Sequence, residues 1–314
     1  MAQNPFTFEK TAFEHWPNCR RFSNGIVDLV IPETFGPRVM SFGFRGGVNV
    51  FKIFPAPLSG AAPQRVRGGH RLWVAPEIPE ITWVNDTAPV TVEFDGHTVT
   101  CTGTVEPASS LEKQMVISLK AEQAAVRILH RVTNRGTAPM HIAPWALTQL
   151  APGGVAVAGL PPRGEHPRDL LPNGSLVMWP YTDLSDPKWQ FLSKYVGLRQ
   201  DAALPAPQKF GVFSPAPWCA YVLDDLLFVK QAHTPRGAEY PDMGCSLEIF
   251  TNPFMMELET LGHLRTLHPG ESAEHTERWT LRANSAIGQW SDDALDSVLS
   301  SVLNDTVTPL LIPG

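Results

Sequence analysis

The chain has 314 residues, of which 43% are hydrophobic and 18% are charged, and its formal net charge is −6. A chain of this length can bury roughly three quarters of its unfolded surface, and β-sandwiches of this size often fold as one domain. The acidic balance, without any basic run, argues against a nucleic-acid partner. We therefore predict one domain over residues 1–314.

The four cysteines lie far apart in the sequence and show no C-x-x-C spacing, so they indicate neither a zinc site nor a disulfide framework. The N-terminal segment MAQNPFTFEKTAFEHW contains no apolar run of signal-peptide length, and no stretch resembles a transmembrane span. These features predict a cytoplasmic monomer or homodimer with reduced thiols and no membrane partner.

Apolar residues alternate with polar ones along many short segments, a pattern typical of half-buried β-strands. Asp95-Gly96 separates two such segments and tolerates the positive φ angles of a type I′ turn, which predicts a hairpin. The predicted strands cover residues 26–31, 39–44, 90–94, 98–101, 115–119, 126–132, 246–250, 254–261 and 275–281.

Two segments depart from this pattern. Residues 151–217 are rich in proline, tryptophan and charge, and we predict an irregular insertion with some short strands. Residues 291–304 carry apolar side chains at helical spacing, with Ser291 and two aspartates at the expected start. The expected fold class is therefore all-β: a large antiparallel β-sandwich with one C-terminal helix.

The segment Gly68–Glu77 reads GGHRLWVAPE and places polar groups among apolar and aromatic neighbours. His70, Arg71, Trp73 and Glu77 are candidates to line a pocket, since the guanidinium fork of arginine suits vicinal hydroxyls or a carboxylate. The alternative is a structural Arg–Glu pair with a core tryptophan.

The segment Phe254–Thr260 reads FMMELET. Side chains two residues apart in a strand share a face, so Glu257 and Glu259 point the same way, and Met256, Leu258 and Thr260 point into a core. Two close carboxylates raise each other's pKa, which favours acid–base work near neutral pH. The alternative is a solvated outer face.

Further candidates lie elsewhere in the chain. Lys230, Glu239, Tyr240 and Asp242 could bind sugar hydroxyls, or they could belong to an ordinary charged loop. Trp145 could stack on a pyranose ring or lie in the core. The histidines show no metal-binding spacing, and no phosphate or dinucleotide motif is present, so we expect neither a metal nor a cofactor.

The chain resembles the galactose mutarotase-like (aldose 1-epimerase-like) proteins, in a branch with the pattern GGHRLW-x-APE. The likeness includes an Asn-Gly turn at Asn24-Gly25, the segment Ile249–Asn252 and the Leu258-Glu259-Thr260 segment. It ends with Pro269-Gly270-Glu271 and His275-Thr276-Glu277. The resemblance implies a β-supersandwich fold, a sugar ligand and Glu259 as the catalytic base. In these enzymes a histidine supplies the acid, but Trp145 stands about where that histidine would be.

The leading hypothesis is an aldose 1-epimerase-type isomerase that acts on a small sugar or short oligosaccharide. Glu259 would be the base, and His70 or Glu257 the acid. The hydroxyl-binding groups would be Arg71, Lys230, Glu239 and Asp242. One alternative is a carbohydrate-binding protein without catalysis. Another is a glycan hydrolase or lyase, in which the insertion over 151–217 would supply extra subsites.

Overall fold

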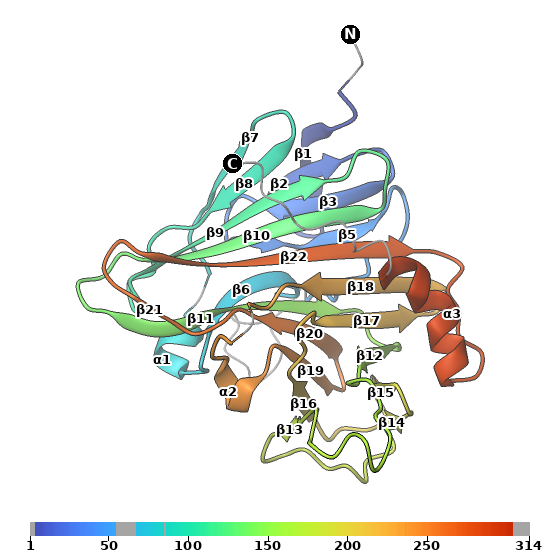
Figure 1. The fold of residues 1–314 in the computed structure, drawn as a ribbon. Helices are drawn as coiled ribbons and strands as arrows, with labels where there is room; N and C mark the ends of the chain where they lie inside the picture. The colour runs from blue at the N-terminus through green and yellow to red at the C-terminus, as the bar shows by residue number, and fades with distance from the viewer. Residues whose placement is uncertain (1–3, 55–66, 85, 236, 304–314) are drawn as a thin grey trace.

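The computed structural model describes residues 4–54, 67–84, 86–235 and 237–303, which form three antiparallel sheets (Figure 1). The four-stranded sheet has the order β1 (Thr7–Phe13), β2 (Trp16–Ser23), β3 (Val27–Pro32), β5 (Ser41–Phe44). The ten-stranded sheet has the order β14 (Trp189–Phe191), β15 (Tyr195–Arg199), β12 (Val155–Gly159), β17 (Trp218–Leu223), β18 (Leu226–Ala232), β22 (Ser272–Arg282), β10 (Ala125–Asn134), β9 (Leu111–Leu119), β8 (Thr98–Thr102), β7 (Thr91–Phe94). The eight-stranded sheet has the order β13 (Leu176–Met178), β16 (Gln208–Val212), β19 (Leu247–Asn252), β20 (Met255–Leu261), β11 (Met140–Leu150), β6 (Gly69–Ala75), β4 (Arg38–Val39), and β21 (Arg265–Leu267) pairs with β11.

The ten-stranded and eight-stranded sheets pack face to face and share the main hydrophobic core. On β20 the inward-facing side chains include Met256 and Leu258, and on β22 they include Trp279. The alternation predicted for these strands therefore places one side-chain set between the sheets. The side chains on the opposite face of the eight-stranded sheet do not take part in this core.

The predicted C-terminal helix is present as α3 (Asp292–Leu303). The Ser291 hydroxyl accepts a hydrogen bond from the backbone N–H of Ala294 at 3.2 Å, which caps the helix. Leu295, Leu299 and Val302 are buried against the outer face of the ten-stranded sheet, beside β17 and β18 (Figure 1). No helix among the described residues is both long enough and apolar enough to span a membrane.

Two details differ from the sequence predictions. The hairpin at Asp95-Gly96 forms, but its connection has three residues, and of these only Gly96 has a positive φ, so the turn is not type I′. The segment 151–217 is more regular than predicted, since β12 to β16 lie within it and join both large sheets. Strand β12 has the sequence VAVAG and is almost fully buried, so it lacks the alternation that reveals a half-exposed strand.

Candidate functional site

The face of the eight-stranded sheet that points away from the core carries a group of polar and aromatic side chains. We call this group the outer-face cluster; it consists of Arg71, Trp73, Trp145, Gln149, Lys209, Glu248, Glu257 and Glu259. Strand register brings these residues together. Leu147 on β11 pairs with Arg71 on β6 and with Glu259 on β20, Gln149 pairs with Glu257, and Glu248 on β19 pairs with Glu259. Residues at equal or two-step offsets along neighbouring strands share a face.

Glu257 is held by two partners from neighbouring strands. The Gln149 side-chain amide donates a hydrogen bond to Glu257 Oε1 at 2.7 Å, and Arg71 Nη2 lies 3.6 Å from the same oxygen. Glu257 is buried, with 7% of its surface exposed. Burial, together with the charge of Glu259, raises the pKa of Glu257 above its ordinary value, and Arg71 opposes that shift.

Glu259 lies two residues further along β20 and has different partners. Its Oε2 accepts a hydrogen bond from Trp145 Nε1 at 2.9 Å and one from the ammonium of Lys209 at 3.0 Å. Lys209 also lies 2.7 Å from Glu248 Oε2 and over the ring of Trp145. Two donors, one of them charged, are thus directed at one oxygen of Glu259.

The cluster contains more carboxyl groups than cations. Burial, with the nearby charges of Glu259 and Asp242, raises the pKa of Glu248 well above its ordinary value. Burial alone would lower the pKa of Lys209, but Glu248 and Glu259 reverse this and raise it well above normal. One buried ammonium is thus shared between two glutamates, which is an arrangement in which a proton is readily retained on one of the carboxyls.

The tryptophans are arranged as supports around these charges. The Arg71 guanidinium lies 3.7 Å from the centre of the Trp73 ring, and the rings of Trp73 and Trp145 meet edge to face with centres 5.6 Å apart. Trp145 is only 2% exposed. Trp145 is therefore a buried donor to the Glu259 carboxylate. Trp73, in contrast, is half-buried and keeps part of its ring accessible.

Glu239, Tyr240 and Asp242 lie on the segment that leads into β19 and line a pocket of about 760 Å³. The pocket contains the short α2 (Pro241–Gly244), in which Asp242 and Met243 have left-handed φ angles of 52° and 61°. Left-handed backbone costs a residue other than glycine about 1–2 kcal/mol. Burial raises the pKa of Asp242, and the charge of Lys209 opposes that shift.

His70 and Lys230 do not reach this face. His70 is adjacent in sequence to Arg71 on β6, so its side chain points to the other side of the sheet, into the space between the two large sheets. Lys230 comes from β18 in the ten-stranded sheet and is fully buried. Both belong to an inter-sheet cluster, which consists of His70, His130, Thr148, Lys230, Thr260, His275 and Glu277.

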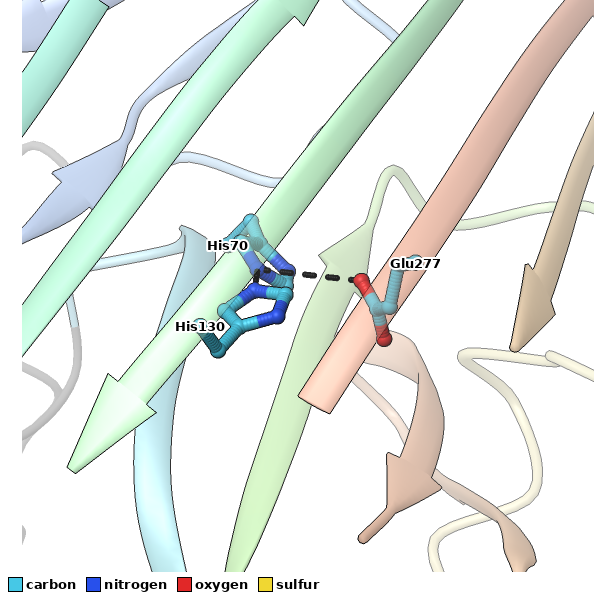
Figure 2. Close-up of side chains that lie close together, drawn as sticks. All are labelled: His70, His130 and Glu277. Carbon is cyan, nitrogen blue, oxygen red and sulfur yellow. Dashed lines mark hydrogen bonds and ion pairs between the residues drawn. The ribbon is translucent and has the colours of Figure 1, made fainter. Parts of the chain in front are cut away.

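Hydrogen-bond partners determine the tautomers in this inter-sheet cluster (Figure 2). His130 Nδ1 donates to the carbonyl of His275 at 3.1 Å, so its Nε2 accepts from His70 Nε2 at 2.7 Å. His70 Nδ1 then accepts from the Thr148 hydroxyl at 2.9 Å. Burial lowers the pKa of both His130 and His275 to about 3, and lowers that of His70 well below normal, so all three rings are neutral.

One set in this cluster has the donor types of a metal site, since ligand atoms of His70, His130 and Glu277 lie within 4.8 Å of one another. However, the ammonium of Lys230 lies 2.7 Å from Glu277 Oε1 and already neutralises that carboxylate. Lys230 also donates to the carbonyls of Ala146 and Leu258. A divalent cation would face this resident charge and would displace bonds that are already formed, so we interpret the cluster as structural.

Glu77 lies beyond the end of β6, is exposed, and accepts a hydrogen bond from the indole of Trp83 at 2.8 Å.

Three members of the outer-face cluster were not anticipated from the sequence: Gln149, Lys209 and Glu248. The available signal was one or two polar residues within an otherwise apolar strand segment, as in LEIF and QKFGV. Such residues are rarely buried unless they are paired.

No family model and no curated protein sequence matches the chain. Solved structures do. A Klebsiella pneumoniae protein provisionally named an aldose 1-epimerase aligns at TM-score 0.58 and 12% identity, over 95% of this chain and 87% of its own. The Slr1438 protein of Synechocystis aligns at 0.55 and 12% identity, over 88% and 99%. A galactose mutarotase-like protein of Lactobacillus casei aligns at 0.54 and 11% identity, over 84% and 100%. The chain therefore has the galactose mutarotase-like β-sandwich fold.

Proposed function

We propose that the protein is an aldose 1-epimerase-type isomerase that exchanges the anomers of a sugar by acid/base catalysis on the outer-face cluster. The observation that carries the proposal is the Glu257/Glu259 pair, in which two buried carboxyls on one strand face have different partners. Two carboxyls on one face with different partners can take the acid and the base role in one reaction. The galactose mutarotase-like fold supports a carbohydrate ligand, although fold alone does not specify chemistry.

In this proposal Glu259 is the base and Glu257 the acid. Glu259 takes the proton from the anomeric hydroxyl, while Glu257 gives its proton to the ring oxygen, so the C1–O5 bond breaks and an open-chain aldehyde forms. Rotation about C1–C2 and the reverse proton transfers close the ring on the other face. The raised pKa of Glu257 supports the acid role, since that carboxyl holds a proton nearer to neutral pH. The two residues are about 7 Å apart along the strand, which leaves room for a sugar to bridge them.

Arg71, Gln149, Trp73 and Lys209 complete the proposed site. Arg71 and Gln149 orient Glu257, and Trp73 offers a partly accessible aromatic face for a pyranose ring. Lys209 and Trp145 hold Glu259 in place, because each donates a hydrogen bond to its Oε2. We do not assign His70 or Lys230 a role in the reaction, because both lie between the sheets.

The test is an NMR anomeric-exchange screen of the wild-type protein across hexoses, pentoses, deoxy sugars and uronic acids. We expect at least one sugar to exchange faster than in buffer. Glu259→Gln should then reduce the rate by roughly 10²–10⁴-fold, the usual contribution of a general base. Glu93→Gln is the matched control, because Glu93 is an exposed glutamate on β7. A wild-type rate equal to the buffer rate for every sugar that binds would rule out the isomerase.

A second candidate is sugar binding without catalysis. Its specific support is that Glu259 is only 1% exposed and that its Oε2 already has two donors. In that case Glu259→Gln changes affinity alone, by roughly the 1.5–3 kcal/mol of a charged hydrogen bond. A cytoplasmic location is a further proposal, which four buried free cysteines support.

A further inference from the structure

The segment 151–217 brings two aromatic side chains to the outer-face cluster. Trp179 and Tyr181 follow β13, which is the edge strand of the eight-stranded sheet. The Lys209 ammonium lies 4.6 Å from the centre of the Trp179 ring, and a Cβ atom at Gly211 would lie 3.3 Å from Trp179 Cη2. Gly211 pairs with Glu248, so the Trp179 ring lies on the face of the sheet that carries the cluster.

The turn that carries Tyr181 is fixed to the sheet by hydrogen bonds. The Thr182 hydroxyl donates to the carbonyl of Lys209 at 2.5 Å and accepts from the backbone N–H of Trp179 at 3.0 Å. The backbone N–H of Thr182 donates to the carbonyl of Trp179 at 2.9 Å. Tyr181 is thus held in a defined place beside β16, and a group held in this way loses little conformational entropy when a ligand binds.

The Tyr181 ring lies against the row of side chains that contains one of the proposed catalytic glutamates. It meets the ring of Phe250 edge to face, with centres 6.4 Å apart. Phe250 on β19 pairs with Lys209 on β16 and with Glu257 on β20, and paired residues of neighbouring antiparallel strands share a face. Tyr181 therefore reaches the outer face from the side of the sheet opposite Trp73 on β6.

The hydroxyl of Tyr181 is a polar group that the fold leaves unused. It forms no hydrogen bond with any residue that the structure describes, and Tyr181 is 43% exposed. Burial raises its pKa to about 12, so the hydroxyl stays protonated and can both donate and accept. The charged groups that act on it are Lys209, Glu259, Glu77 and Glu257.

We infer that Tyr181 contacts the substrate, and that its hydroxyl forms a hydrogen bond with a ring hydroxyl of the sugar bound at Glu257 and Glu259. The place of the sugar rests on the proposed function. A tyrosine suits this task, because its ring covers C–H groups while its hydroxyl bonds an O–H group. A site that bonds a substrate hydroxyl rejects analogues that lack it, so Tyr181 would determine specificity away from the anomeric carbon.

The first experiment measures Kd by saturation-transfer NMR for D-glucose, D-galactose, D-xylose and D-glucuronate. Tyr181→Phe removes only a hydroxyl without a partner among the described residues, so it should fold as wild type does. We expect it to raise the Kd of the tightest-binding sugar by roughly threefold to tenfold, the loss of one neutral hydrogen bond. Tyr181→Ala should raise it by roughly tenfold or more, because the ring contact is lost as well. Phe191→Ala is the matched control: Phe191 is an aromatic residue of the same segment, 52% exposed, but lies on β14 in the other large sheet, and the variant should keep the wild-type Kd.

The second experiment repeats the wild-type and Tyr181→Phe measurements with the monodeoxy derivatives of that sugar. One derivative should bind both proteins equally, because it lacks the hydroxyl that Tyr181 contacts and the bond is already lost. The other derivatives should keep the difference between the two proteins. A role in folding alone would not depend on which hydroxyl the sugar lacks.

The outcomes separate this inference from the isomerase. If Tyr181→Phe keeps the wild-type Kd, or weakens every monodeoxy derivative equally, the contact is wrong and the isomerase stands. If no sugar exchanges its anomers but Tyr181→Phe weakens binding as expected, the isomerase is wrong and the contact stands. If none of the sugars binds to the wild-type protein, both are wrong.

Discussion

Two groups of buried charged residues lie on opposite faces of the eight-stranded sheet, and they differ in how completely they are paired. In the inter-sheet cluster Lys230 meets one carboxylate, Glu277, and three neutral histidines and two threonines satisfy one another. In the outer-face cluster one ammonium, Lys209, is shared by Glu248 and Glu259.

This difference in pairing indicates which cluster is structural and which is the candidate catalytic site. A buried polar network with every partner present stabilises one packing arrangement, and it has no spare group to offer a ligand. A buried group of carboxyls with raised pKa values is costly for the fold, and such cost is typical of sites that carry out chemistry. The same β6, β11 and β20 strands thus place structural groups on one face and candidate catalytic groups on the other.

The largest expected effect is on the fold, from breaking the inter-sheet ion pair. Lys230→Met should lower the free energy of unfolding by about 3–5 kcal/mol, because Glu277 is left buried without its cation. Urea denaturation measures this loss. Combining it with Glu277→Gln should restore part of the stability. A loss below about 1 kcal/mol would contradict the structural role.

The two clusters should also affect the pH dependence of stability in opposite directions. The His130 pKa is about 3 when folded and about 6.5 when unfolded, so between these values only the unfolded chain binds this proton. This histidine therefore makes stability fall as the pH falls from about 6.5 toward 3. Glu248 has a raised pKa when folded, so just above pH 4.5 the folded chain holds the extra proton, and this contribution is lost as the pH rises.

We therefore expect His130→Gln to reduce the slope of unfolding free energy against pH, between pH 5 and 6, by about 1.4 kcal/mol per pH unit. Glu248→Gln should increase the slope, because it removes the group that binds its proton more tightly in the folded chain. Denaturation curves at several pH values in that interval measure both slopes. Equal shifts in the same direction would show that the two clusters are not distinguished in this way.

A smaller effect is expected on stability at neutral pH. Glu248→Gln removes one carboxyl from the group that shares Lys209, while Lys209 keeps Glu259 as its partner. The variant should be more stable than wild type by about 1 kcal/mol at pH 7.5 and less active in anomeric exchange. This is the usual trade-off between stability and function. Asp225→Asn, on the exposed turn between β17 and β18, is the control and should change neither property. Destabilisation by Glu248→Gln would mean that the Lys209 pair outweighs the crowding of charges.

The sequence was sufficient for much of the fold and for the centre of the candidate site. Period-two alternation around Glu257 and Glu259 predicted their shared face, and Met256 and Leu258 lie in the core as expected. The same rule excludes His70 and Arg71 from a common pocket, since neighbours in a strand point to opposite faces. The pocket predicted for GGHRLW therefore divides into two environments.

The remaining site residues depend on long-range register that a single sequence does not contain. Lys209 reaches Glu259 across β19, over a separation of 50 residues, and Lys230 enters the interior from the opposite sheet. The segment 151–217 was hard to interpret for a related reason. Its strands are short, and those buried on both faces lose the alternation that identifies a strand.

The most direct test of the central claim makes one substitution in each cluster. For each variant, the rate of anomeric exchange and the free energy of unfolding are both measured. Glu259→Gln should reduce anomeric exchange by roughly 10²–10⁴-fold and change the free energy of unfolding by less than about 1 kcal/mol. Glu277→Gln should lower the free energy of unfolding by about 3 kcal/mol or more, because Lys230 loses its buried partner. In the fraction that remains folded, its exchange rate should be within a few-fold of wild type. A loss of exchange in folded Glu277→Gln with none in Glu259→Gln would place the chemistry between the sheets and contradict the account.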